Sequence, residues 1–335
     1  MSNIMLPRNA IAIRKTLGTA SRAEIVTAVT HKTSTATLLD YPPGAYTGMR
    51  TFDKLGIMDF TGHTARLANS LQQIRFPTQD PKIPVSGHSS VEAAATTQRL
   101  APLRRPDVMK EETTNLVKAG LKFYYKNRTD DVLGPADETK VTVLCTWDHK
   151  NQEPTLLAHF EPLKTPKTPM CKVEVSGSPR HHPTAKDSQW IRDRSGLEAS
   201  LDKDSNEALL FEESTQDIYE GLSSNFFAFD RARRTVLTAP LDSVLQGTIL
   251  KVVVNVCNSE NIPVEFKFPN LKHTHEWEGA FISSTSRLVL PIEKLVMPDG
   301  SVKVFAPSPT IELIRREVLK ECRERVEPIL TKEDI

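Results

Sequence analysis

Apolar side chains recur at helical spacing in two segments of the first half of the chain. Residues 61–74 place Leu67 and Leu71 on one side of a helix. Residues 107–126 repeat this spacing behind Asp107, a residue type that favours the N-cap position. We therefore predict one helix for each segment.

Other apolar segments are rich in β-branched and aromatic residues and end at turn-forming residues. The segments 140–147 and 155–160 are separated by a polar turn, which is typical of a β-hairpin. β-Branched composition predicts further strands at 25–27, 35–39, 171–176, 207–212, 223–229, 235–238, 263–267, 285–291 and 302–305.

The segment that follows Gly247 has two interpretations. Its β-branched residues favour a strand, but Ile249, Val252 and Val256 also fit one face of a helix. The sequence leaves both open. A helix here would bring its N-terminal N–H groups to the Gly247 turn, where a phosphate could bind. A second amphipathic helix is predicted from about Pro309 onward.

Proline-rich segments indicate how the chain is divided. Pro162, Pro166 and Pro169 form a stiff connector, the best candidate for a domain boundary. Further prolines interrupt a long insert. We predict an α+β fold of two domains. The predicted divisions are an N-terminal tail over 1–22, an N-terminal α/β domain over 23–165 with the insert at 76–106, a cofactor-binding domain over 166–307, and a C-terminal helix and tail over 308–335.

Composition narrows the class of protein. The chain has 335 residues, 39% of them hydrophobic and 25% charged, with a net charge of +1. We therefore expect no recruitment of nucleic acid or of an anionic membrane by a global field. The four cysteines are scattered and predict reduced thiols in a cytoplasmic protein. We expect no metal site. The basic N-terminus resembles a mitochondrial or plastid transit peptide, but Pro7 interrupts any helix there, and we expect a plain cytosolic tail.

Two ionisable residues stand in segments that suit a cofactor. Lys186 lies in a loop-like segment, and Glu220 precedes a small polar turn that leads into an aromatic strand. We expect Ser223, Ser224 and Asn225 to surround Glu220 and to fix its geometry. The later segments 245–248 and 283–286 offer turns whose N–H and hydroxyl groups can bind phosphate. An amine for a Schiff base, a carboxylate for the pyridinium nitrogen and phosphate-binding turns are what a protein needs to hold pyridoxal phosphate.

In order and kind, these segments resemble the class IV (fold-type IV) pyridoxal-phosphate enzymes. That family includes branched-chain and D-amino-acid aminotransferases and aminodeoxychorismate lyase. The resemblance spans roughly residues 30 to 305, apart from the insert and a divergent stretch to about 165. Each motif is weak alone, but six in this order are hard to obtain by chance. The motifs are Tyr46-Thr-Gly-Met-Arg50, His63-Thr-Ala-Arg66-Leu, Ala185-Lys186, Glu220-Gly-Leu-Ser-Ser-Asn225-Phe-Phe, Leu245-Gln-Gly247-Thr248-Ile249 and Phe281-Ile-Ser-Ser-Thr285-Ser286.

The resemblance implies a smaller N-terminal α/β domain and a larger C-terminal pseudo-barrel α/β domain, with the site in the cleft between them. It implies a homodimer. Lys186 would be the catalytic residue, and Glu220 would meet the pyridinium nitrogen. The implied cofactor-binding residues are Arg66, Lys186, Glu220, Asn225, Leu245, Gly247, Thr248, Ile249 and Thr285, and the substrate-binding candidates are Tyr46, Arg50 and Ser286.

The implied activity is transfer of an amino group between an amino acid and a 2-oxo acid. The chain departs from the family pattern in lacking a tyrosine shortly after Lys186 and in carrying Thr47 where a glutamate is usual. A lyase reaction on the same cofactor, or a catalytically inactive homologue, therefore remains as an alternative. Arg66 as a solvated surface residue and Arg50 in a structural salt bridge are the plainer interpretations of those two side chains.

Overall fold

The computed structural model describes residues 9–16, 23–76, 92–128, 138–166 and 168–335. The chain forms two compact units. Unit 1 comprises residues 1–164, 185–192 and 326–335, and unit 2 comprises residues 165–184 and 193–325. This division differs from the predicted one in a way that matters for the site, because the segment around Lys186 belongs to unit 1.

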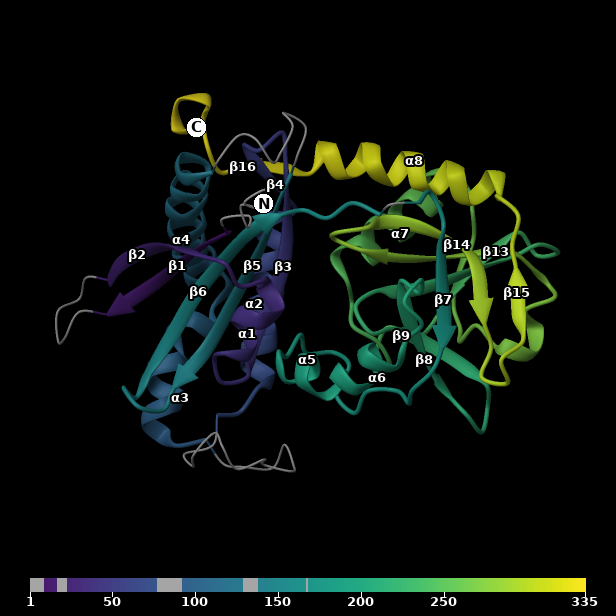
Figure 1. The fold of residues 1–335 in the computed structure, drawn as a ribbon, viewed down its shortest axis with the longest axis horizontal. Coiled ribbons are helices and arrows are strands. Elements are labelled where there is room, and N and C mark those ends of the chain that lie inside the picture. The colour runs from purple at the N-terminus through teal and green to yellow at the C-terminus, as the bar shows by residue number, and fades with distance from the viewer. Residues whose placement is uncertain (1–8, 17–22, 77–91, 129–137, 167) are drawn as a thin grey trace, which may run out of the picture. The chain divides into compact units, whose positions relative to one another are not determined.

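Unit 1 is built on one β-sheet with helices packed against it (Figure 1). Its described residues form a 7-stranded sheet in the order β16-β4-β3-β5-β6-β1-β2. Its strands are β1 (Asn9–Thr16), β2 (Ala23–Thr30), β3 (Gly44–Phe52), β4 (Gly56–Met58), β5 (Thr139–Asp148), β6 (Glu153–Pro162) and β16 (Val326–Pro328). Its helices are α1 (Ser34–Leu39), α2 (Phe60–Gln73), α3 (Ala94–Leu100) and α4 (Pro106–Asn127), with short 3₁₀ turns at Pro102–Arg104 and Lys332–Asp334.

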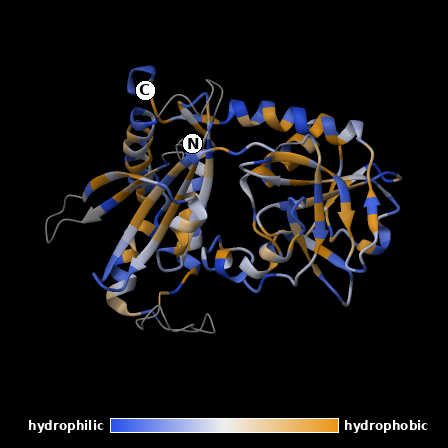
Figure 2. Ribbon diagram, in the orientation of Figure 1, coloured by the Kyte–Doolittle hydropathy of each residue, from blue (hydrophilic) through white to orange (hydrophobic). Residues whose placement is uncertain are grey.

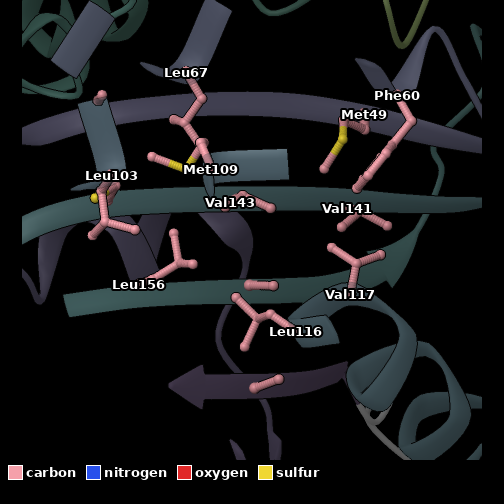
Figure 3. Close-up of a cluster of buried hydrophobic side chains, with 14 of the residues drawn as sticks. Met49, Phe60, Leu67, Leu103, Met109, Leu116, Val117, Val141, Val143 and Leu156 are labelled. Atoms are coloured by element: carbon pink, nitrogen blue, oxygen red, sulfur yellow. The ribbon is translucent and has the colours of Figure 1, made fainter. Parts of the chain in front are cut away.

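Helices α2 and α4 cover one face of this sheet and bury its main core. Leu67 of α2 and Leu116 of α4 meet Val141 and Val143 of β5, as Figure 3 shows. Buried and partly exposed side chains alternate along β3, and Met49 is one of the buried residues in this core. The predicted helices at 61–74 and 107–126 and the predicted β5–β6 hairpin are confirmed. The prediction of Asp107 as an N-cap is wrong, because α4 begins at Pro106 and Asp107 lies in its first turn.

One strand prediction for unit 1 is wrong. The segment 35–39 is part of helix α1, in spite of its β-branched residues. The Thr33 side chain caps the helix by accepting the N–H of Ala36. The buried Glu161 carboxylate also accepts both the N–H and the hydroxyl of Ser34. These local hydrogen bonds outweigh a weak β-propensity.

Unit 2 contains a barrel-like ring of strands. Strand order β10-β13-β14-β7-β8-β9 closes on itself, because β9 also pairs with β10. The strands of this unit are β7 (Cys171–Val175), β8 (Glu207–Glu212), β9 (Asp217–Gly221), β10 (Asn225–Asp230), β11 (Thr235–Thr238), β12 (Val264–Phe266), β13 (Trp277–Ser284), β14 (Leu288–Val296) and β15 (Val302–Val304). Its helices are α6 (Ser195–Ser200), α7 (Thr248–Ser259) and α8 (Pro309–Glu324), with a 3₁₀ turn at Leu271–His273, while α5 (Gln189–Asp193) spans the boundary of the units.

In unit 2 the structure decides one segment that the sequence left open and shifts one predicted strand. The ambiguous segment after Gly247 is helix α7, whose buried face includes Ile249, Val252 and Val256. The strand predicted at 285–291 begins at Leu288, and the unpredicted strand β13 precedes it. Helix α8 is amphipathic as predicted, with hydrophilic and hydrophobic residues interspersed along it (Figure 2).

The described cysteines are all buried and unbridged, which confirms the prediction of reduced thiols. Burial raises the pKa of Cys145 to about 12. Within the described ranges, no helix has both the length and the apolar character needed to cross a membrane. The insert predicted at 76–106 lies partly outside the described residues, and its described end contains α3.

Candidate functional site

Lys186 is fixed in unit 1 by its backbone on both sides. Its N–H donates to the Ser70 hydroxyl of α2 at 3.1 Å, and its carbonyl accepts the Tyr46 N–H of β3 at 3.0 Å. The next residue, Asp187, forms a β-bridge with Ala45. These backbone hydrogen bonds and the neighbouring isolated β-bridge hold the Lys186 backbone beside β3.

The Lys186 amine lies over an aromatic ring. Its Nζ is 4.7 Å from the centre of the Tyr46 ring, a distance at which a ring face attracts an ammonium group. Arg50 stands on the same face of β3 as Tyr46, since residues four apart share a face, but roughly 13 Å further along the strand. Its guanidinium lies 4.7 Å from the centre of the Phe52 ring. The structure thus brings Tyr46 to Lys186, while Arg50 lies further along β3 beside Phe52.

Arg66 projects from α2 toward β3. One of its terminal nitrogens, Nη2, donates to the Thr47 hydroxyl at 2.8 Å and to Nδ1 of His63 at 3.1 Å. Burial lowers the pKa of Arg66 to about 10, opposed by the charge of Asp59. The guanidinium still carries its charge at neutral pH. The interpretation of Arg66 as a solvated helix-surface residue does not hold in this structure.

His63 lies between cations. The side chain is buried, and burial, followed by the charges of Arg66 and Lys186, lowers its pKa well below the ordinary value. His63 is therefore a neutral imidazole in the folded protein. Its lowered pKa also places Arg66 and Lys186 within electrostatic reach of one ring, so unit 1 concentrates positive charge at this point.

Glu220 of unit 2 is held by donors on both oxygens. Arg180 donates from Nε and Nη2 to Oε1, at 2.8 and 2.6 Å, and the Leu245 N–H donates to Oε2 at 3.1 Å. Both side chains of this ion pair are at least nine-tenths buried. Arg180 also donates to the carbonyl of Pro183. The carboxylate predicted as the functional acid is therefore rigidly positioned at the end of β9.

Asn225 and Gly247 place the start of helix α7 next to this carboxylate. The Asn225 amide donates to the Leu245 carbonyl at 2.8 Å, and a Cβ on Gly247 would lie 2.3 Å from the Asn225 Oδ1. A glycine is needed for this approach. The next residue, Thr248, begins helix α7. The first N–H groups of a helix have no acceptor within it, so this end of α7 presents donors.

The late turn at Thr285 and Ser286 is held from outside. Arg287 anchors it by donating to the Glu207 carboxylate at 2.7 Å and to the Ser223 hydroxyl at 3.1 Å. The hydroxyls of Ser223 and Ser224 also donate to Glu207. Of the three residues expected to surround Glu220, Ser223 and Ser224 donate to Glu207 instead, while Asn225 pairs with Glu220 between β10 and β9. The two serines join the turn after β9 to the turn after β13 through a buried glutamate.

The candidate residues therefore form two groups. Unit 1 gathers Tyr46, Arg66 and Lys186, and unit 2 gathers Glu220 with its neighbours Asn225, Leu245, Gly247, Thr248 and Ile249. Sequence reasoning missed the partners Arg180, Glu207 and Arg287. A lone arginine six positions before a lysine, or a glutamate at the start of a strand, carries no pattern that separates it from surface charge. Only the tertiary contacts reveal these three.

Comparison with known structures gives the same fold. A branched-chain aminotransferase from the thermophilic archaeon Thermoproteus uzoniensis, solved with norvaline, has a TM-score of 0.63 at 15% identity, with 96% of this chain and 99% of that chain covered. The branched-chain amino acid aminotransferase of Thermobaculum terrenum in its PLP form has a TM-score of 0.64 at 14% identity, covering 98% and 100%. At these identities the likeness shows the fold alone.

A family comparison assigns the chain. No curated protein matches it. The family model described as amino-transferase class IV matches residues 44–295, from the first residue of β3 to the last part of β14. This range includes Tyr46, Arg66, Lys186 and Glu220 and covers well over half of the sequence. The chain therefore belongs to the class IV aminotransferases.

Proposed function

We propose that the chain is a pyridoxal-phosphate enzyme that transfers an amino group between an amino acid and a 2-oxo acid. Membership of the class IV aminotransferases supports the reaction class. The observation that carries the proposal is the position of the Lys186 amine, which is strand-anchored in the same unit as the Arg66 guanidinium. An amine for the aldehyde and a partly buried cation for the phosphate are the two groups the cofactor requires.

The residues of both units fit this cofactor. In unit 1 the charges of Arg66 and Lys186 together act on His63, and a phosphate ester supplies the negative charge that such a cluster favours. In unit 2 the glycine at 247 is required by the close approach of Asn225. That turn leads into α7, whose N-terminal N–H groups can bind an anion.

We assign the following roles. Arg66, Thr248, Ile249 and Thr285 would hold the phosphate, Lys186 would bind the cofactor through Nζ, and Leu245 and Asn225 would hold its ring. Glu220, held by Arg180 and the Leu245 N–H, faces the ring nitrogen and keeps a proton there. When bound, the cofactor supplies an electron-accepting ring beside the substrate's α-carbon. The substrate-facing residues in this proposal are Tyr46, Arg50 and Ser286.

Lys186 then has a second task. With the cofactor bound, the free Nζ amine would act as the general base that takes the proton from the substrate's α-carbon. The Tyr46 ring beneath the amine keeps Nζ directed to one side of the strand edge. We also propose a cytoplasmic homodimer, and sedimentation of the purified chain would check its mass in solution.

The test is a visible absorption spectrum with a matched lysine control. Wild-type protein incubated with pyridoxal phosphate is expected to gain visible absorbance, and borohydride followed by peptide mass spectrometry is expected to find the adduct on Lys186. Lys186→Ala should abolish both signals. Lys126→Ala, at an exposed position of α4, should leave both unchanged. Absorbance that survives in Lys186→Ala would refute the assignment.

A second assay separates the reaction types. With an amino acid and 2-oxoglutarate, a transaminase forms glutamate, whereas a lyase forms pyruvate and ammonia from a suitable amino acid. Glutamate formation that depends on Lys186 is the expected result. Pyruvate with ammonia would identify the lyase instead, and a bound cofactor with neither product would identify an inactive homologue.

A further inference from the structure

Thr47 and His63 form a small polar seat for Arg66 between β3 and α2. The three side chains contact one another: Arg66 Nη2 lies 2.8 Å from Thr47 Oγ1 and 3.1 Å from His63 Nδ1, and these two acceptors lie 2.9 Å apart. Thr47 and His63 each have 0% exposure. They therefore have no access to solvent, and their hydrogen bonds serve the interior of unit 1.

The directions of the hydrogen bonds follow from chemistry. A guanidinium only donates, so His63 Nδ1 accepts from Arg66 and carries no proton. The ring proton is then on Nε2. The Thr47 hydroxyl oxygen accepts from Arg66, which leaves its own proton free to point to His63 Nδ1. This arrangement requires a neutral His63, in agreement with its lowered pKa.

Thr47 and His63 orient Arg66 without adding a negative charge of their own, although the charge of Asp59 also acts on the guanidinium. Neither Thr47 nor His63 contributes a negative charge, whereas a carboxylate in the same place would form an ion pair with the guanidinium. One nitrogen of Arg66, Nη2, is committed to the seat, and this fixes the plane of the group at the end of a long side chain. Because the guanidinium is already held in place, little conformational entropy of the Arg66 side chain is lost when an anion binds to it. A mobile arginine would lose more.

We infer that Thr47 and His63 are positioning residues that hold Arg66 for a phosphate monoester, and that they set how strongly the protein prefers phosphorylated pyridoxal compounds over their unphosphorylated forms. The inference rests on the proposed binding of pyridoxal phosphate. It goes beyond it by assigning the preference to two buried neutral side chains that touch the arginine and not the ligand.

The experiment compares pyridoxamine 5'-phosphate with pyridoxamine by titration calorimetry. Neither compound forms a bond to Lys186, so binding is read without the covalent step. Thr47→Val keeps the shape of the side chain but removes the acceptor. It is expected to weaken binding of the phosphorylated compound by about tenfold to a hundredfold, the range for a hydrogen bond to a charged group. Pyridoxamine binding should be unchanged.

Conservative variants complete the design. Thr47→Ser keeps the hydroxyl and should retain the wild-type preference. His63→Asn offers an amide oxygen near the place of Nδ1 and should retain most of it, whereas His63→Leu should lose it. Thermal unfolding of each variant identifies any general loss of structure. If the apolar variants fold poorly, the preference for the phosphorylated compound can still be measured in Thr47→Ser and His63→Asn.

Two results would overturn the inference. One is an unchanged preference in both Thr47→Val and His63→Leu, and the other is an equal loss of affinity for both compounds in folded variants. These results are distinct from a failure of the proposed function. Intact discrimination without any adduct on Lys186 would contradict the covalent role of the lysine and leave the seat supported.

Discussion

Gly247→Ala tests whether the turn before α7 is as tightly packed as the structure indicates. The added Cβ would lie 2.3 Å from the Asn225 Oδ1, which is far inside van der Waals contact. Asn225 has 5% exposure, and its amide donates to the Leu245 carbonyl at 2.8 Å. The amide cannot move away without losing that bond. Leu245 in turn donates its N–H to Glu220, so the disturbance reaches the carboxylate.

The magnitude follows from three contributions. Overpacking in a well-filled site costs about 1–3 kcal/mol. Loss of the Asn225–Leu245 hydrogen bond adds about 1 kcal/mol. Gly247 has φ −63° and ψ 150°, which alanine adopts without strain. Alanine also has less conformational freedom than glycine in the unfolded chain, which stabilises the folded protein by about 0.4–1 kcal/mol. The free energy of unfolding should therefore fall by about 1–4 kcal/mol in total.

The assay is urea unfolding of Gly247→Ala beside Gly196→Ala. A Cβ at Gly196 would meet nothing within 4 Å, and this glycine lies inside helix α6. Gly196→Ala should therefore be neutral or stabilising, by up to about 1 kcal/mol. We also expect Gly247→Ala, but not the control, to weaken pyridoxal phosphate binding. Equal stability of the two variants would refute the packing argument.

Three further predictions concern buried charge and buried thiols. Arg180→Met removes both guanidinium hydrogen bonds from buried Glu220 and should lower the free energy of unfolding by about 3–5 kcal/mol in urea titration; a loss under about 1 kcal/mol would contradict a tight pair. The lowered pKa of His63 means that below about pH 6.5 the unfolded chain binds a proton that the folded chain does not. The free energy of unfolding should then fall by up to about 1.4 kcal/mol per pH unit until the folded pKa is reached, a slope that His63→Asn should reduce. Burial raises the pKa of Cys145 and Cys257 to about 12, so a thiol reagent at pH 8 should label them in urea but not in the native protein.

Residues with a repeated spacing or an ordered motif were predictable. The α2 and α4 helices follow from apolar spacing, and the β5–β6 hairpin follows from two β-branched segments around a polar turn. The order of six short segments that resemble the family's motifs also predicts the family, which the family model over residues 44–295 confirms. Lys186 and Glu220 are therefore candidates on the sequence alone, without knowledge of any contact.

The sequence by itself determined the local elements, the candidate amine and carboxylate, and the family, since these depend on neighbouring residues. Only the tertiary structure decided that 35–39 is helical, that the segment after Gly247 is a helix, and that Arg180 rather than a nearby serine holds Glu220. The reason is physical. Propensities differ by tenths of a kcal/mol, while burial of an apolar face or pairing of a buried charge contributes several, and those partners lie tens of residues away along the chain.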